Sequence, residues 1–281
     1  MPRTGFVGAH VQDDFLRARR RRAASLVMRR LRGEPGDVNV ILPFEEVIAA
    51  LGRAGEHRLG LQVIPLDSIV GTVDRTREFD RQFRPTTGRV RGRWERVAAA
   101  MRRGESLPPI DVYRIGELHF VRDGHHRVSV ARALGRSDID AYVTEVETRV
   151  PIESGLRPSD LFCKDHERLF YERVPLTPAA RERIRLSDPL DYASLAEGVE
   201  AWGMRAMQER HAFMDRAQVA REWYDHEYLP VVELLRDAGL LGPGTEADSY
   251  QLLSSERYRL LRTHEWSDEA IATLARQPPR R

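Results

Sequence analysis

Five consecutive residues, Asp123 to Arg127, bring together an acid, a glycine, two histidines and an arginine. A strand-like run from Leu118 to Arg122 precedes them, and a helical pattern of small residues follows and stops at Gly135. A glycine turn that opens a helix presents free backbone N–H groups and the positive end of the helix dipole. Such a turn suits a phosphate, and Arg127, one turn into the helix, could add a bidentate clamp.

An ordinary structural turn is the competing interpretation of this segment. Asp-Gly before a helix is common capping and turn chemistry, and a short glycine motif is weak evidence by itself. His125 and His126 would point about 100° apart on a helix, so they cannot share one wall, but both can line a ligand at the helix end. Alone, the segment favours a phosphate or nucleotide site only slightly over a structural turn.

The elements that must position these residues follow a definite order. Upstream, the residues from Leu61 to Ile69 predict a strand that leads into a short turn. Then come a polar stretch at 75–84, a helix at 94–103, a hairpin with strands at 110–114 and 118–122, the glycine turn with its helix, and a last strand at 139–146.

This order and its residues resemble the ParB/sulfiredoxin superfamily from Leu61 to Val146, about a third of the chain. In ParB-type N-terminal domains, a Leu-Asp-x-Ile strand leads to an arginine-bearing loop, and a Pro-Ile strand and a Gly-x-x-Arg signature follow. The matching residues here are Leu66 to Ile69, Arg75 and Arg77, Pro109 and Ile110, and Gly124 and Arg127. The combination is specific for the fold and less specific for the activity, because one fold hosts many activities.

The resemblance implies an α+β fold: a ParB/sulfiredoxin-like N-terminal domain followed by a mostly α-helical C-terminal domain. We expect an N-terminal helical extension at residues 1–58, the ParB/sulfiredoxin-like domain at 59–147 and the helical domain at 160–276. The last region resembles domains of unknown function that accompany such modules. Long amphipathic helices are predicted in it at 194–211 and 216–238, and Pro230 should kink or restart the second.

The superfamily hosts three chemistries that the residues help to separate. Sulfiredoxin-like members carry a reactive cysteine directly after the signature glycine, where this chain has His125. Its single cysteine, Cys163, is expected to be a small buried apolar residue. Partition-type members bind a nucleotide, usually CTP, and carry a helix-turn-helix for DNA, which this sequence does not show convincingly. Free-serine kinases carry Asp-Gly-His-His-Arg, which matches Asp123 to Arg127 residue for residue.

The kinase resemblance identifies the candidate catalytic residues. In those kinases a glutamate in the loop after the first strand is the base for the serine hydroxyl, and that position is Val73 here. A neighbouring carboxylate would have to replace it, and the candidates are Asp74, Glu78 and Asp80, with Asp123 as the candidate for magnesium or the acceptor.

The resemblance also implies a nucleotide cofactor, ATP, ADP or CTP, with Mg²⁺. The candidate binding residues are Gly124, His125, His126, Arg127, Arg75 and Arg77. Only one of the 45 basic residues is a lysine, Lys164. Phosphate recognition near the motif must therefore use arginine, histidine and backbone amides.

Composition limits the remaining classes. At 281 residues and 41% apolar, the chain is long and apolar enough for one large or two modest globular domains. The net charge of +2 gives no global electrostatic sign of nucleic-acid binding. One cysteine excludes a disulfide framework and suits a reducing compartment. We find no apolar run that would cross a bilayer and no signal-peptide core, so we expect a cytoplasmic protein.

The N-terminal segment is locally basic. Eight arginines lie between Arg17 and Arg32, interleaved with apolar residues, and predict an amphipathic helix that ends at Gly33. Such a helix could lie on nucleic acid or on an anionic membrane surface. We favour a solvated helix packed by its apolar stripe.

The sequence as a whole favours a nucleotide- or phosphate-binding ParB-like protein with a small-molecule phosphotransferase activity. Its partner would be a nucleotide or a phosphorylated small molecule. Two alternatives stay open. One is a DNA-associated partition or regulatory protein that uses a nucleotide as a switch, and the other is a ligand-binding module without catalysis.

Overall fold

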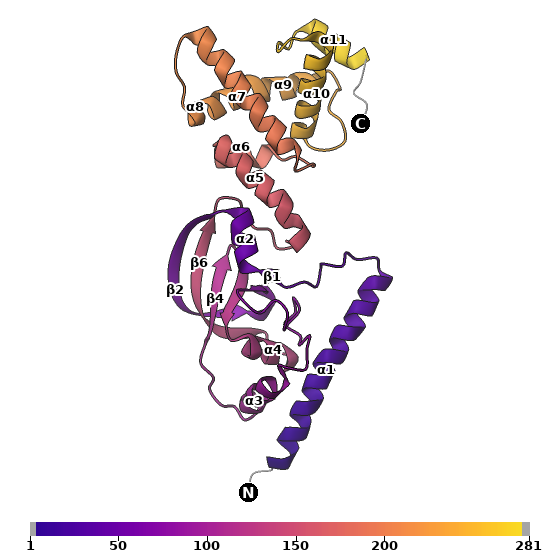
Figure 1. Cartoon of the computed structure of the whole chain (residues 1–281), viewed down its shortest axis with the longest axis vertical. Coiled ribbons are helices and arrows are strands. Elements are labelled where there is room, and N and C mark those ends of the chain that lie inside the picture. Colours follow the sequence, from indigo (N-terminus) through magenta and orange to yellow (C-terminus); the bar gives the residue numbers. More distant parts are fainter. Residues whose placement is uncertain (1–3, 277–281) are drawn as a thin grey trace. The chain divides into compact units, whose positions relative to one another are not determined.

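The chain forms two compact units, which divide at residues 161–162. The structure, a computed structural model, describes residues 4–276. The first unit contains one mixed β-sheet with helices, and every element described after residue 161 is a helix (Figure 1). This confirms the expected fold class, an α+β region followed by a mostly helical one.

Six strands form the sheet in the order β1-β3-β5-β4-β6-β2. They are β1 (Leu42–Pro43), β2 (Arg53–Pro65), β3 (Ile69–Thr72), β4 (Ile110–Ile115), β5 (Leu118–Asp123) and β6 (Asp138–Thr148). β4 and β5 form the predicted antiparallel hairpin, and β3 lies parallel to β5. Because parallel strands end at the same edge of a sheet, Thr72 and Asp123 leave the sheet on one side.

Strand β2 crosses the expected domain boundary between residues 58 and 59. It begins at Arg53 and pairs antiparallel with β6, and β1 pairs with β3, so residues 42–58 belong to the sheet unit. The first half of β2 is mostly exposed and polar on both faces. It therefore lacks the apolar alternation that would have revealed a strand. A short 3-10 helix, η1 (Leu66–Ser68), separates β2 from β3.

Four helices belong to the sheet unit: α1 (Thr4–Leu31), α2 (Phe44–Leu51), α3 (Arg91–Arg102) and α4 (His125–Ala133). The indole of Trp94 in α3 is fully buried and donates a 2.8 Å hydrogen bond to the hydroxyl of Ser129 in α4. Phe15 of α1 packs edge-on against Trp94 at 5.5 Å between ring centroids. These contacts fix α4, and with it the glycine turn, against α3 and α1.

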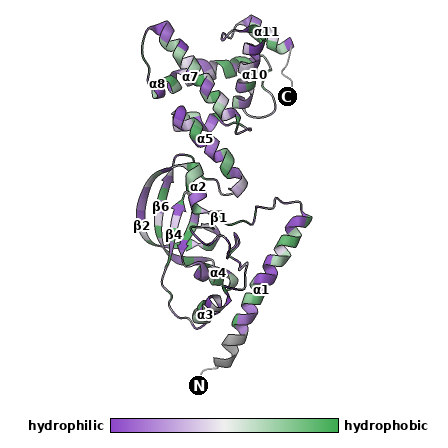
Figure 2. Cartoon of the chain, viewed as in Figure 1, coloured by the Kyte–Doolittle hydropathy of each residue, from purple (hydrophilic) through white to green (hydrophobic). Residues whose placement is uncertain are grey.

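Helix α1 is packed over only part of its length. Val11, Phe15 and Ala18 are buried, which agrees with the favoured interpretation of a helix packed by an apolar stripe. Towards its C-terminal end, Val27 and Leu31 are 60% and 77% exposed. Polar and apolar residues alternate along this part of the helix (Figure 2).

The second unit is built from seven α-helices within residues 161–276. They are α5 (Leu161–Arg173), α6 (Pro178–Arg183), α7 (Asp191–Arg210), α8 (Arg216–Trp223), α9 (Leu229–Asp237), α10 (Glu246–Leu261) and α11 (Asp268–Arg276). A 3-10 turn, η2 (Pro158–Asp160), leads into α5. A π-helical turn, η3 (Tyr224–Tyr228), joins α8 to α9 and lies directly before Pro230. Proline has no N–H for the i−4 carbonyl, so the interruption expected at this residue is confirmed as a π turn.

Two further observations bear on the sequence predictions. Cys163 is exposed at the start of α5, so the prediction of a buried cysteine is wrong. Among the described helices, none is both long and apolar enough to cross a membrane.

Candidate functional site

The glycine turn between β5 and α4 requires glycine for two reasons. Gly124 has φ +103°, a left-handed conformation that side chains other than glycine's rarely adopt. A Cβ atom built on Gly124 would also lie 2.4 Å from Cγ2 of Ile110 on β4. The turn therefore packs its backbone directly on the neighbouring strand, and the Asp-Gly pair sets the direction in which α4 begins.

The N-terminus of α4 has no side-chain cap. Gly124 occupies the capping position, and no side chain accepts a hydrogen bond from the first turn there. The first N–H groups of a helix have no partner within it, so they can donate to an external anion. A pocket of about 230 Å³ opens at this end and is lined by Arg75, Arg93, Val97, Leu107, Pro108, Asp123, Gly124, His125, His126 and Arg127.

Three arginines line this pocket, and they differ in how far their side chains are already paired within the protein. The Arg75 guanidinium donates a 2.8 Å hydrogen bond to Glu78, and this contact raises the pKa of Arg75. Arg93, in the first turn of α3, is exposed, and its side chain makes no hydrogen bond or ion pair within residues 4–276. Arg93 is therefore the arginine of the pocket whose charge is most available to a ligand.

Arg127 is engaged inside the protein. Its guanidinium donates to the carbonyl oxygens of Pro108 and Pro109, the latter at 2.7 Å, and to the carboxylate of Asp123. The side chain is 13% exposed, whereas that of Asp123 is 67% exposed. In this arrangement Arg127 holds the Pro108-Pro109 segment and Asp123 against the turn, instead of extending as a free clamp.

His125 is buried beside the end of β3. Its Nε2 lies 2.7 Å from the Thr72 hydroxyl oxygen, which also accepts a hydrogen bond from the Arg75 amide. The ring of His125 stacks near Phe79, at 6.2 Å between centroids. Burial lowers the pKa of His125 to about 4, although Asp74 acts in the opposite direction. The imidazole is therefore neutral at pH 7.

His126 is also buried and neutral. Burial first, and then the positive charges of Arg93 and Arg75, lower the pKa of His126 to about 4. Its ring meets Phe79 edge-on at 5.5 Å, and its Nδ1 is buried with no hydrogen-bond partner in the described structure. The two adjacent histidines thus contribute apolar contacts and neutral ring nitrogens to the wall of the pocket.

The three candidate carboxylates after β3 occupy different places. Asp74 Oδ1 lies 3.6 Å from Nε2 of His125, and the Asp74 side chain is 61% exposed. Glu78 is paired with Arg75. Asp80 is turned away into its own loop, where its carboxylate accepts from the amides of Gln82 and Arg84 and from the Arg84 side chain at 2.9 Å.

The candidate residues from the sequence fall into two groups, those that gather at the N-terminus of α4 and those that do not. Asp74, Asp123, Gly124, His125, His126, Arg127 and Arg75 come together around the N-terminus of α4. Asp80 is 6% exposed and acts as a structural anchor, and Arg77 is exposed and does not line this pocket. The sequence did not show that Arg77 and Asp80 would lie away from the pocket, because the loop that carries them folds back on itself through the Phe79–Pro85 bridge.

Two residues of the site were missed from the sequence. Thr72 lies between the predicted strand and the polar stretch and carried no signal of its own, but it is the hydrogen-bond partner of His125. Arg93 lay just outside the helix predicted from Trp94, whereas α3 begins at Arg91 and carries Arg93 in its first turn. The sequence signal that could have drawn attention to Arg93 was its charge directly before the apolar pattern of the predicted helix.

The site contains few ligands for a metal ion. Within the part of the chain that the structure describes, no three His, Cys, Asp or Glu residues are grouped so that they could hold one. Asp123 and Asp74 are the exposed carboxylates next to α4. Mg²⁺ often keeps one or two protein carboxylates and takes its other ligands from phosphates and water. The donor set therefore fits a magnesium ion that arrives with a nucleotide.

No protein-family model and no curated protein matches the chain. Among solved structures it is similar to sulfiredoxin from Arabidopsis thaliana, with 19% identity and a TM-score of 0.24 over 31% of this chain and 86% of that chain. It is also similar to a Pnob8-like ParB-N domain, with 12% identity and a TM-score of 0.22 over 78% of this chain and 80% of that chain.

Proposed function

We propose that this chain is a ParB/sulfiredoxin-like protein that binds the phosphates of a nucleotide at the N-terminus of α4. One observation carries the proposal: the uncapped first turn of α4 opens into a pocket that Arg75 and Arg93 line. Backbone N–H groups and the helix dipole attract an anion there, and arginine adds charge-assisted hydrogen bonds.

The size of the pocket favours the phosphates over the whole nucleotide. Its volume of about 230 Å³ is below the roughly 300–1,000 Å³ of sites that enclose a drug-sized ligand. The base and the sugar of ATP, ADP or CTP would therefore extend beyond the pocket. Nucleotides and a reducing environment are both found in the cytoplasm, where we expect the protein to act.

A phosphotransferase activity is supported by the position of Asp74. Its exposed carboxylate lies next to His125 and beside the α4 N-terminus, so a small hydroxyl compound could reach both it and a bound nucleotide. Asp74 would accept the hydroxyl proton while the acceptor oxygen bonds to the terminal phosphorus. The bond from that phosphorus to the bridging oxygen would break, and the remaining nucleotide would leave with the electron pair.

His125, Arg127 and Asp123 would support this reaction by position and charge. Neutral His125, fixed by Thr72, holds the wall that Asp74 faces without adding a positive charge. Arg127 keeps Asp123 at the turn. Mg²⁺, when bound with the nucleotide, would neutralise phosphate charge, and Asp123 is the residue that would hold it.

Binding and transfer can be tested in two steps. ATP, ADP and CTP with magnesium should raise the unfolding temperature of the protein, because ligands that bind the folded state stabilise it by mass action. The protein is then incubated with ATP or ADP, magnesium and a panel of small hydroxyl compounds, free serine first. A phosphorylated product that wild type makes and Asp74→Asn does not would support phosphotransfer. Binding without any product would leave a ligand-binding module and remove the enzyme.

A DNA-associated role is the second candidate, and helix α1 favours it. Arg19, Arg20 and Arg30 are exposed on α1 and have no ion pair in the described residues. If they contact DNA phosphates, affinity should fall steeply with salt, with a log–log slope of about −0.9 for each contact. We expect no sequence-specific binding, since the sequence pattern shows no recognition helix. A footprint on a defined site at physiological salt would promote this role over phosphotransfer.

A further inference from the structure

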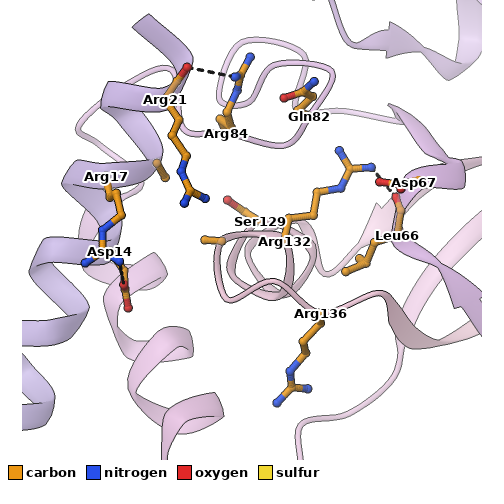
Figure 3. A pocket seen from close by; sticks show the side chains of 12 residues that line it. Asp14, Arg17, Arg21, Leu66, Asp67, Gln82, Arg84, Ser129, Arg132 and Arg136 are labelled. Carbon is orange, nitrogen blue, oxygen red and sulfur yellow. Dashed lines mark hydrogen bonds and ion pairs between the residues drawn. The ribbon is translucent and has the colours of Figure 1, made fainter. Parts of the chain in front are cut away.

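A second hollow lies on the same domain and shares no lining residue with the pocket at the α4 N-terminus. Its volume is about 350 Å³, and it is enclosed by α1, by α4 and by the loops that carry Leu66 and Arg84 (Figure 3). Because four segments that are far apart in the sequence form it, no local sequence motif predicts it.

Facing stripes of the two helices build its walls. Asp14, Arg17 and Arg21 recur on α1, Ser129 and Arg132 recur on α4, and Arg136 follows the end of α4. Residues three, four and seven positions apart lie on one face of a helix. The spacing therefore turns Arg17 and Arg21 of α1 and Arg132 of α4 towards the same hollow.

The charges of the hollow do not balance. It is lined by five arginines and two aspartates. Asp14 is engaged by Arg102, whose Nε donates to it at 2.8 Å. Arg84 is engaged by Asp80 at 2.9 Å, so this pair contributes little net charge. Asp67 is then the remaining carboxylate of the hollow.

Arg132 provides a charge that is held in place without being neutralised. Its guanidinium donates to the carbonyl oxygens of Leu66 and Ile69 and, at 3.4 Å, to that of Arg81. No carboxylate in the described chain lies within ion-pair distance of it. Carbonyl oxygens fix the orientation of a guanidinium but leave its unit charge, which then attracts an anion.

Arg21 and Ser129 complete the inner surface. Arg21 extends from α1 towards Ser129 (Figure 3) and has no side-chain hydrogen bond or ion pair among residues 4–276. Ser129 is 3% exposed, and its hydroxyl oxygen accepts from Trp94, which leaves its own proton to donate. Arg17, 3.9 Å from Asp14, lies at the margin, as does Arg136, which points away from the others.

The end of α4 does not oppose a negative ligand here. The amides of Gly135 and Arg136 donate to the carbonyls of Arg132 and Ala131, so these last carbonyls are satisfied within the chain. The part of α4 that faces the hollow therefore presents the Arg132 guanidinium and the Ser129 hydroxyl, and no free carbonyl oxygen of its last turn.

We propose that this hollow is a second anion site, which binds a phosphate or pyrophosphate group through Arg21, Arg132 and Ser129. Arg17 adds charge at the entrance. The group could be the free inorganic ion or the end of a small phosphorylated molecule. The site is separate from the proposed nucleotide site, and its ligand needs neither Arg75 nor Arg93.

Calorimetric titration of the full chain with inorganic phosphate and pyrophosphate tests the proposal. The variant Arg17→Ala/Arg21→Ala removes two charges from the hollow, and Arg19→Ala/Arg20→Ala removes two from another part of the same helix. We expect the first variant to lose at least tenfold in pyrophosphate affinity. The second variant should stay within twofold of wild type, and Arg93→Ala, titrated in parallel, reports the share of binding at the other pocket. Circular dichroism checks the fold, and Arg21→Gln replaces the double variant if the latter unfolds.

Three results would overturn the proposal. The first is no pyrophosphate binding by wild type at millimolar concentration. The second is an equal loss in the two double variants, which would indicate a diffuse basic surface. The third is a loss in Arg93→Ala alone, which would place the anion at the N-terminus of α4. A phosphate ester such as glycerol phosphate, titrated in parallel, separates the two sources of the group, since tighter binding than inorganic phosphate indicates a small phosphorylated molecule.

Discussion

The hydroxyl of Thr72 and the imidazole of His125 are hydrogen-bonded, with 2.7 Å between Oγ1 and Nε2. This contact joins the end of β3 to the first residue of α4, two elements more than fifty residues apart. The same hydroxyl accepts from the Arg75 amide at 3.1 Å. One buried oxygen thus positions both the loop that carries Asp74 and Arg75 and the helix end that they face.

Replacing Thr72 should therefore lower the free energy of unfolding by more than the small change in side-chain volume would suggest. Thr72→Val keeps the shape but leaves His125 Nε2 and the Arg75 N–H without this partner. A buried polar group left unsatisfied costs about 1–3 kcal/mol. Thr76→Val, at an exposed position in the same loop, is the matched control and should cost less than about 0.5 kcal/mol. Urea denaturation measures both, and equal stability of the two variants would contradict the role given to Thr72.

Gly124 and Gly135 both have a left-handed backbone, but only Gly124 has a close neighbour. Alanine substitutions at the two positions therefore separate the cost of backbone strain from the cost of a steric clash. Gly124→Ala would place a Cβ 2.4 Å from Ile110, whereas a Cβ on Gly135, with φ +74°, meets no atom within 4 Å. The left-handed conformation alone costs about 1–2 kcal/mol, and overpacking adds about 1–3 kcal/mol. Gly124→Ala should therefore be the less stable variant by at least about 1 kcal/mol in chemical denaturation. A smaller cost than that of Gly135→Ala would show that β4 does not pack on the turn.

Three buried histidines should make the protein sensitive to mild acid. Burial lowers the pKa of His119, His125 and His126 from the usual value of 6.5 to about 4 in each case. Between these values the unfolded chain binds protons that the folded chain does not. The contribution of these histidines to the free energy of unfolding is therefore fully present above about pH 6.5 and is lost as the pH falls towards 4. The loss is at most about 1.4 kcal/mol for each pKa unit and each histidine.

Denaturation at pH 5.0 and pH 7.5 measures this loss. His126→Asn removes one of the three titrating groups, so the difference in stability between the two pH values should be smaller in this variant than in wild type. An exposed histidine, His211, provides the control, and His211→Asn should leave the difference unchanged. Equal stability of wild type at both pH values would contradict the burial of neutral imidazoles.

Arg127 should affect both binding and stability. Arg127→Ala removes the donors to the Pro108 and Pro109 carbonyls and releases Asp123 from the turn. We expect nucleotide affinity to fall at least tenfold, which corresponds to about 1.4 kcal/mol, and the unfolding temperature to fall as well. Calorimetry and thermal unfolding report the two effects. Unchanged affinity in a folded variant would remove Arg127 from the site.

The fold was largely predictable from local patterns. The hairpin of β4 and β5, helix α4 with its stop at Gly135, and the interruption before Pro230 all follow from apolar periodicity and from glycine and proline chemistry. The start of β2 was missed because its first residues are polar on both faces. Such a strand is defined by its pairing with β6, which no local pattern encodes.

The candidate site was predictable in its location and less so in its contacts. The glycine turn before a helix indicated the position of the pocket at the start of α4, and Asp74 does lie beside His125. The inward direction of Arg127 depends on carbonyls of Pro108 and Pro109, which reach it only through the tertiary fold. The same holds for Asp80, which Arg84 and two amides engage.

The central claim, a nucleotide phosphate bound at the N-terminus of α4, is tested most directly at Arg93. Calorimetric titration with ATP, ADP and CTP, each with magnesium, compares wild type, Arg93→Ala and Arg89→Ala. Arg93 lines the pocket, whereas Arg89 is exposed just before α3 and does not line it. Our account predicts that at least one nucleotide binds wild type, that Arg93→Ala weakens it at least fivefold, and that Arg89→Ala stays within twofold. No binding by wild type, or the same affinity in both variants, would contradict it.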